Sequence, residues 1–239
     1  MGDKNLNDLL RWSIENTVSG PDGTTNEPPR STLNPEALAG LMGGPSDADL
    51  MRESMAAIVS SDPEITLESK LTAFDNLEQL IESLDNANLL SNLGLWTPLL
   101  ECLAHDEDEI RLMAAWCIGT AVQNNEPSQE RLVALGGVEK LVQMAIGKRL
   151  PASSSVNGES GDAAKTVETG KQETNTNRRK AVYALSSAVR NYQPAMDVCA
   201  TELRRQGEHV GGDGKPIDAT DMDAVDLVIN GLREKVTGT

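Results

Sequence analysis

Apolar side chains recur every three or four residues through most of the chain, a spacing that places them on one face of a helix. Near the N-terminus, Leu6, Leu9 and Leu10 form one such stripe in a segment over 4–16 that is too short to be stable alone. Residues 17–35 are rich in Gly, Pro, Thr and Asn and predict a flexible linker. The pattern therefore predicts a helical protein preceded by a separate arm.

The main series of predicted helices begins at Ser46, which forms a helix-start pattern with Asp49. A longer helix begins near Thr66 and keeps one face apolar as far as Leu84. Thr97, followed by a proline, predicts the N-cap of a later helix. The other predicted helices cover 88–93, 110–122, 128–135 and 138–146, with Gly136 and Gly137 as the break between the last two, and a final helix opened by Thr220 and Asp223.

The chain repeats itself. Phe74 and Trp116 lie 42 residues apart, as do the Leu-Gly pairs at 93–94 and 135–136. This period falls within the roughly 40 to 47 residues of armadillo and HEAT units, small helix sets that bury their cores by stacking on one another. In a third copy, Tyr183 matches Trp116 at an offset of 67 residues instead of 42. A polar segment over 151–177, inserted between the two copies, accounts for the longer offset.

The predicted fold is all-α: a short, armadillo-like, right-handed helical solenoid over 46–205. A flexible, disordered N-terminal arm over 1–45 precedes it, and the polar segment over 151–177 forms a long disordered loop insertion. Residues 206–239 are predicted to be a linker and a C-terminal helix. Only six aromatic residues occur in 239, which argues against a sandwich or barrel.

The charge excludes one class of ligand. With 21 Lys and Arg against 37 Asp and Glu, the net charge is −16, and no basic block is present to neutralise phosphates. Nucleic acid and anionic membrane surfaces are therefore not expected partners. Residues 1–20 show no signal-peptide pattern and no window resembles a membrane span, so we expect an intracellular chain. Three widely spaced cysteines, Cys102, Cys117 and Cys199, predict buried thiols rather than disulfides or a zinc site.

No catalytic or cofactor motif is found. His105 and His209 lie in separate loops without ligand partners, and no phosphate-binding loop or nucleophile elbow occurs. The acidic run over 106–109 is typical of a helix N-terminus. Peptide-binding armadillo proteins carry an Asn four residues after a Trp, but Thr120 and Ser187 stand at those places. These observations favour recognition of a folded partner, with no metal and no cofactor.

Six short runs, in order from the N-terminus to about residue 195, form a specific set. They cover 9–16, 41–45, 51–55, 74–78, 84–88 and 119–125. Together they closely resemble the fungal armadillo-type nucleotide-exchange factors of the seventy-kilodalton heat-shock chaperones. The long polar insertion and the short repeat array depart from that family's pattern.

The resemblance implies a cytosolic, monomeric co-chaperone without catalytic residues. Such a protein binds the chaperone's nucleotide-binding domain, accelerates ADP release, and so permits ATP rebinding and client release. The alternatives are an armadillo-type scaffold or adaptor for another folded protein and, third, an enzyme whose site is not visible in the sequence.

Contacts with the chaperone are expected at the amide-rich helix ends. One group surrounds a small residue, Ala87, where bulk or charge is expected to abolish binding without unfolding. The full set is Asn86, Ala87, Asn88, Gln123, Asn124, Asn125, Arg190 and Asn191. The competing interpretation is that some of these Asn residues only cap helices. In the arm, the expected client-release residues are Leu9, Leu10, Trp12 and Ile14; docking of the arm on the first helices is the alternative.

Overall fold

The computed structural model describes residues 44–151, 172–208, 210 and 216–238. In these ranges the regular structure consists of ten α-helices and one 3-10 helix, with no strand. The helices are α3 (Asp47–Val59), α4 (Leu67–Ile81), α5 (Leu84–Asn92), α6 (Trp96–Glu101), η1 (Cys102–Ala104), α7 (Asp108–Ala121), α8 (Glu126–Ala134), α9 (Gly137–Ala145), α10 (Asn175–Val189), α11 (Gln193–Arg205) and α12 (Met222–Thr237). All of them belong to one compact unit, Asp47–Thr239. The all-α prediction is confirmed.

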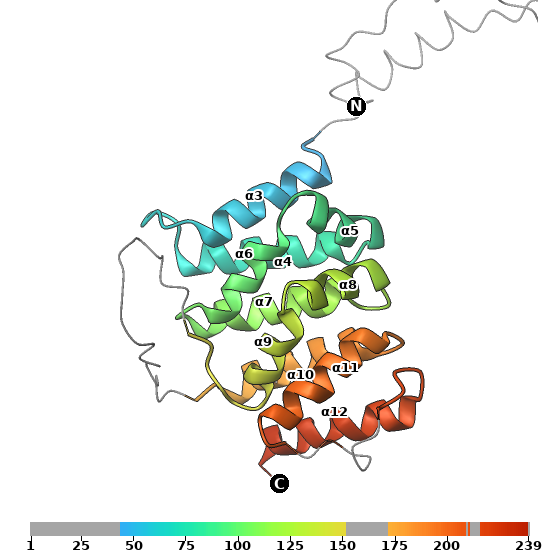
Figure 1. The fold of residues 1–239 in the computed structure, drawn as a ribbon. Coiled ribbons are helices and arrows are strands. Elements are labelled where there is room, and N and C mark those ends of the chain that lie inside the picture. Colours follow the sequence, from blue (N-terminus) through green and yellow to red (C-terminus); the bar gives the residue numbers. More distant parts are fainter. Residues whose placement is uncertain (1–43, 152–171, 209, 211–215, 239) are drawn as a thin grey trace, which may run out of the picture. The chain divides into compact units, whose positions relative to one another are not determined.

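The helices stack in two layers, as expected for an armadillo-like solenoid (Figure 1). One layer, which we call the ladder, is the series α4, α7, α10 and α12, in which each helix packs on the next. The second layer contains α5, α6, α8, α9 and α11, and α3 packs on α4. Each unit buries its apolar face against its neighbours, so the core runs along the whole stack.

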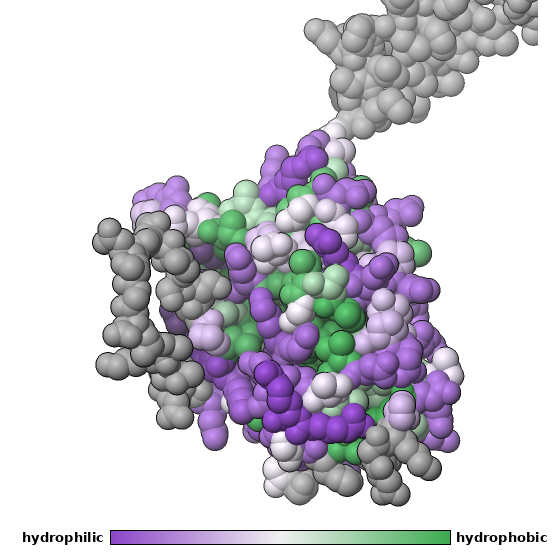
Figure 2. Space-filling model, viewed as in Figure 1, coloured by the Kyte–Doolittle hydropathy of each residue, from purple (hydrophilic) through white to green (hydrophobic). Residues whose placement is uncertain are grey.

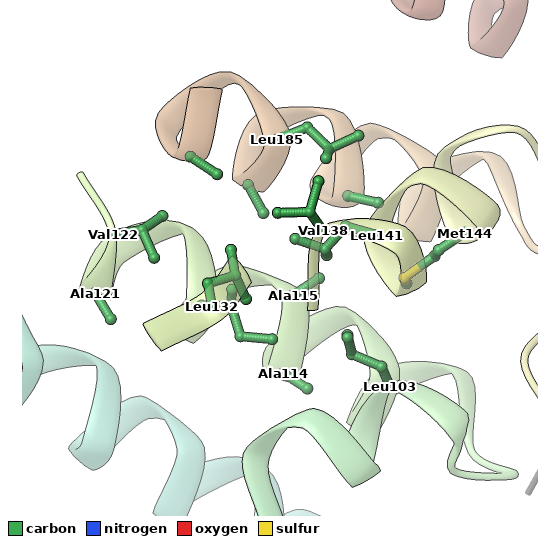
Figure 3. Close-up of a cluster of buried hydrophobic side chains, with 14 of the residues drawn as sticks. Leu103, Ala114, Ala115, Ala121, Val122, Leu132, Val138, Leu141, Met144 and Leu185 are labelled. Atoms are coloured by element: carbon green, nitrogen blue, oxygen red, sulfur yellow. The ribbon is translucent and has the colours of Figure 1, made fainter. Parts of the chain in front are cut away.

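Helix α7 lies at the centre of this core. Its Ala114, Ala115 and Ile118 are fully buried. Figure 3 shows Val138 and Leu141 of α9 pointing into the space between α7 and Leu185 of α10. In the view of Figure 2, apolar side chains gather along the middle of the face and polar ones surround them. The three cysteines are buried and free, as predicted, and burial raises the pKa of Cys102 to about 11 and that of Cys199 to about 12.

Several predicted helix ends are correct. Thr66 is the N-cap of α4 and accepts a hydrogen bond from the Ser69 N–H. Gly94 and Gly136 both have φ of +70°, the left-handed conformation that closes one helix before the next begins. The sequence therefore predicts these helix ends correctly, because a cap or a left-handed glycine depends only on residues a few positions away.

Other helix starts were wrong by one or two residues. The fourth predicted helix begins at Trp96, with Leu95 rather than Thr97 as N-cap, and no side chain caps it. Both Leu95 and Trp96 are buried in the core. The last helix is capped by Asp221, whose carboxylate accepts from the N–H groups of two following residues. Thr220 instead closes a turn by donating to Asp218.

Some residues that the periodicity placed on apolar faces are exposed, namely Val59, Leu67, Leu84 and Leu227. Leu84 begins α5 rather than ending α4 and is 55% exposed, and Leu227 of α12 is 64% exposed. The α12 helix nevertheless packs on the ladder. Asp226 of α12 pairs with Arg190, the C-cap residue of α10, and the Asn191 N–H donates to the carbonyl oxygen of Ala219 over 2.9 Å.

The predicted disordered insertion over 151–177 extends too far at its C-terminal end. Glu173 is buried, and α10 already begins at Asn175. The guanidinium of Arg111, 1% exposed, donates two hydrogen bonds to the Glu173 carboxylate at 2.9 and 2.8 Å and also pairs with Asp108. A further donor to Glu173 is the side-chain amide of Asn177, at 2.8 Å. This buried network fixes the start of α10, which a local polar composition could not indicate.

Replacing Arg111 with Met should destabilise the fold by about 3 to 5 kcal/mol, because the Glu173 carboxylate would stay buried without its cation. The double change R111M with E173L should recover much of that loss, since no buried charge remains. Urea unfolding followed by circular dichroism measures both. Arg52→Met is the control, because Arg52 and Asp49 form a pair with both side chains more than half exposed. Equal stabilities of the wild type and R111M would show that the buried Arg111–Glu173 pair does not stabilise the fold.

Candidate partner-binding surface

The predicted contact residues divide into exposed and buried groups. Gln123, Asn124 and Asn191 are exposed, and Asn88 and Arg190 are half-buried. Asn86, Ala87 and Asn125 are buried, with exposures of 8%, 2% and 2%. The arm residues Leu9, Leu10, Trp12 and Ile14 lie outside the described residues.

The buried asparagines cap helices of the ladder. The side-chain amide of Asn86 donates to the Leu80 carbonyl oxygen at the end of α4, over 3.0 Å, and to the Asp47 carboxylate. The amide of Asn125 donates to the Ala121 carbonyl oxygen at the end of α7, over 3.1 Å. Carbonyls at a helix end have no partner inside the helix, so such donors stabilise it. For these two residues the capping interpretation is correct.

A third cap was missed in the sequence. Gln129 of α8 is 3% exposed, and its side-chain amide donates to the carbonyl oxygens of Ser187, Ala188 and Arg190, at distances from 3.0 to 3.2 Å. These are the last carbonyls of α10 and its C-cap. The repeat offset predicts where α10 ends. It does not predict that Gln129 of the preceding unit caps that end, because no local sequence pattern marks this glutamine.

The expectation that Ala87 is accessible is wrong. Its side chain belongs to the buried cluster, since it lies on the inward face of α5. A bulky or charged residue there would enter the core before it could meet a partner. Position 87 therefore cannot separate binding from folding.

The exposed amides lie beside the ladder. Gln123 and Asn124 line a shallow depression of about 360 Å³. Its other lining residues are Glu78 of α4, the α4 C-cap residue Glu82, Thr120 of α7 and Tyr183 of α10. Thr120 donates to the Glu78 carboxylate over 2.7 Å, and this bond joins α4 to α7. The depression therefore spans three successive helices of the ladder.

Asn124 and Asn191 occupy equivalent positions in consecutive repeats. Their φ angles are +51° and +57°, and they are the non-glycine residues of the described chain with positive φ. Asparagine tolerates this left-handed conformation better than most residues. Both side chains remain exposed. The turns after α7 and α10, which we call the corners, therefore present amides that the fold itself does not bury.

Aromatic residues extend the same surface. Trp116 of α7 is half-buried and Tyr183 of α10 is 36% exposed, whereas Phe74, at the matching position of α4, is fully buried. The three matched positions therefore differ in burial, and the two later ones are accessible from the ladder. Lys180 of α10 places its ammonium over both accessible rings. We call the surface formed by Glu78, Glu82, Trp116, Thr120, Gln123, Asn124, Lys180 and Tyr183 the ladder face.

Nothing in the described residues forms a metal centre. Within these ranges no group of three or more His, Cys, Asp or Glu side chains is placed to hold an ion. Arg149 pairs with Asp106 in the acidic run, and the His105 ring accepts a hydrogen bond from the Glu107 N–H.

Among the described helices, none is long and apolar enough to cross a membrane.

Replacing Ala87 with Arg should lower the free energy of unfolding by about 3 kcal/mol or more, because a charged side chain would enter a packed core. Gln123→Arg introduces the same side chain at an exposed position and should change it by less than about 0.5 kcal/mol. Urea denaturation of both variants measures the difference. An Ala87→Arg protein as stable as Gln123→Arg would show that residue 87 is open to solvent.

This chain is similar to a known family and to several fungal proteins. A family model described as "Nucleotide exchange factor Fes1" matches residues 6–90. The protein named "Hsp70 nucleotide exchange factor FES1" of Gibberella zeae is 53% identical over 99% of this chain and 99% of its own length. The Neurospora crassa protein named "Hsp70 nucleotide exchange factor fes-1" is 48% identical over 98% of both chains. The Saccharomyces cerevisiae protein named "Hsp70 nucleotide exchange factor FES1" is 40% identical over 77% of this chain and 56% of its own length.

Identities of 53% and 48% over nearly the whole of both chains go beyond what a shared helical repeat alone produces. The chain belongs to the Fes1 family of nucleotide exchange factors.

Proposed function

We propose that this protein is a co-chaperone that binds the nucleotide-binding domain of a cytosolic Hsp70 and accelerates ADP release. The relatives named Hsp70 nucleotide exchange factor, similar over nearly the whole chain, carry this proposal. ATP then rebinds to the chaperone, and the client is released. The exchange factor acts as a monomer and supplies no catalytic group or cofactor.

Exchange without a catalytic group follows from linkage. A partner that binds the open, nucleotide-poor arrangement of the chaperone's lobes more tightly than the closed one weakens nucleotide binding by the same factor. Shifting the lobes from 1:99 to 99:1 open requires a difference of about 5.5 kcal/mol in binding free energy. A rigid partner surface provides this difference better than a flexible one, because a flexible surface adapts to both arrangements.

The ladder face supports the proposal as the contact surface. It is built on three packed helices, and its exposed amides at 123 and 124 need no rearrangement to reach a partner. Asn191 continues the amide series at the end of α10, where Arg190 is held by Asp226. We include Gln123, Asn124, Arg190 and Asn191 in the contact surface, with half-buried Asn88 at its margin.

Stopped-flow fluorescence tests the function directly. Labelled ADP is bound to the Hsp70 nucleotide-binding domain and chased with ATP, with and without the full-length protein. The rate of ADP loss should rise at least about tenfold and saturate with the concentration of the exchange factor, as linkage requires. Binding of the protein without faster ADP loss would favour a scaffold or adaptor and contradict exchange.

A matched pair of variants tests the surface. Asn124→Gly removes the amide but keeps a residue suited to positive φ, so folding should be preserved. Asn230→Gly makes the same exchange at an exposed position on α12, where a helix-interior glycine costs about 1 kcal/mol. The first variant should need several-fold more protein for half-maximal acceleration, and the second should match the wild type.

For the N-terminal arm we propose a separate role in releasing the client, through Leu9, Leu10, Trp12 and Ile14. The arm model requires that ADP release and client release can be separated.

Deleting residues 1–34 should leave the acceleration of ADP release within about twofold of the wild type and slow the release of a fluorescent peptide client. The reason is that the helices of the ladder lie C-terminal to the deletion. The same two assays on one preparation measure both rates. A loss of ADP-release acceleration in the truncated protein would contradict the arm model.

A further inference from the structure

One cation on the ladder face is held by aromatic rings instead of by a carboxylate. The Lys180 ammonium lies 3.9 Å from the centre of the Trp116 ring and 5.4 Å from that of Tyr183. The two rings come from α7 and α10, so the stack bridges successive helices of the ladder. A cation over an aromatic face is attracted by the ring quadrupole, most strongly over Trp.

Gly119 permits this arrangement. A Cβ atom at position 119 would lie 2.5 Å from Cε1 of Tyr183 and 3.1 Å from the Ala184 backbone. The absence of a side chain therefore lets Tyr183 lie against α7, where its ring and that of Trp116 reach the same ammonium. Close backbone approach thus determines where Lys180 is held.

Lys180 differs from the cations of this fold that are held by ion pairs. Arg111, Arg190 and Lys235 each pair with a carboxylate. Within the part of the chain that the structure describes, no carboxylate lies within ion-pair distance of Lys180. Its side chain is half-buried, and this burial lowers the pKa of the ammonium, while Glu78 at longer range opposes the shift.

The charge around Lys180 is also distinctive. The whole chain has a net charge of −16. On the ladder face, Glu78 of α4 and its C-cap residue Glu82 are both acidic. On α10, Lys180 lies beside Arg179, an exposed cation. An acidic chain that presents a cationic position on its partner surface is suited to a partner with negative charge at that point, because opposite charges fix register.

We propose that Lys180 is a specificity-determining contact that binds a carboxylate side chain on the chaperone's nucleotide-binding domain. The proposal rests on the function proposed above and names the chemistry of the partner at one position. The stack orders the lysine before binding, so less side-chain entropy is lost in the complex. Trp and Tyr beside the ammonium exclude water and strengthen the ion pair, as in interface hot spots.

The test uses full-length protein with Lys180→Met, Lys180→Arg and Lys180→Glu, and titration against the Hsp70 nucleotide-binding domain. Lys180→Met should weaken binding about tenfold at roughly 50 mM salt, and the loss should shrink at roughly 500 mM, where charges are screened. Lys180→Arg should stay within about threefold of the wild type, because a guanidinium also stacks on Trp and binds carboxylates. Lys180→Glu should bind at least about fivefold more weakly than Lys180→Met through like-charge repulsion.

Lys140→Met is the matched control, since it removes one positive charge from α9 in the other layer. It should bind like the wild type. Thermal unfolding of every variant identifies any that are misfolded, and Lys180→Arg together with the salt dependence of the wild type still tests the proposal if Lys180→Met is unstable.

Two results would overturn the Lys180 assignment. Wild-type affinity of Lys180→Met would show that the stack only joins α7 to α10, and equal affinities of Lys180→Met and Lys180→Glu would exclude a partner carboxylate. With either result, the proposed exchange function still stands if the wild-type protein accelerates ADP loss. A wild-type protein that neither binds nor accelerates would overturn both proposals.

Discussion

The close packing of α7 against α10 is the contact on which the rest of the structure depends. Gly119 allows the approach, and the buried alanines of α7 leave room for Val138 and Leu141 from the second layer. Because each unit completes its core only on its neighbours, a fault at this central step would divide the stack into two poorly buried halves. The accessible rings of Trp116 and Tyr183, and with them the position of Lys180, result from the same packing.

Helix ends are stabilised across unit boundaries as well. The amides of Asn86, Asn125 and Gln129 cap α4, α7 and α10, and Gln129 reaches from one repeat to the next. Buried amides that lose their partners are costly, so these bonds hold the corners in fixed positions relative to the ladder. The exposed amides of Asn124 and Asn191 are thereby presented from rigid corners.

The sequence predicted the fold well because the repeat period, Gly94, Gly136 and the cap at Thr66 all act locally. It predicted the site only in part. Whether an asparagine caps a helix or faces a partner depends on which carbonyls lie opposite, and those belong to other segments. The same reason explains Glu173, which reads as part of a polar insertion but binds Arg111, 62 residues away. Ala87 was misplaced because its burial depends on the helices that pack against α5, and those belong to other segments.

The division between buried and exposed polar groups bears on how exchange operates. If the amides at the corners were mobile, binding would cost side-chain and backbone entropy in both chaperone arrangements, and the difference between open and closed lobes would shrink. In this molecule the buried amides are used to fix the corners, and a different set of amides, together with a cation already stacked on two rings, remains for the partner. Under the proposed function, a surface ordered in this way favours one lobe arrangement over the other, because it does not adapt to both. That selectivity is the physical requirement for releasing a nucleotide that the exchange factor never touches.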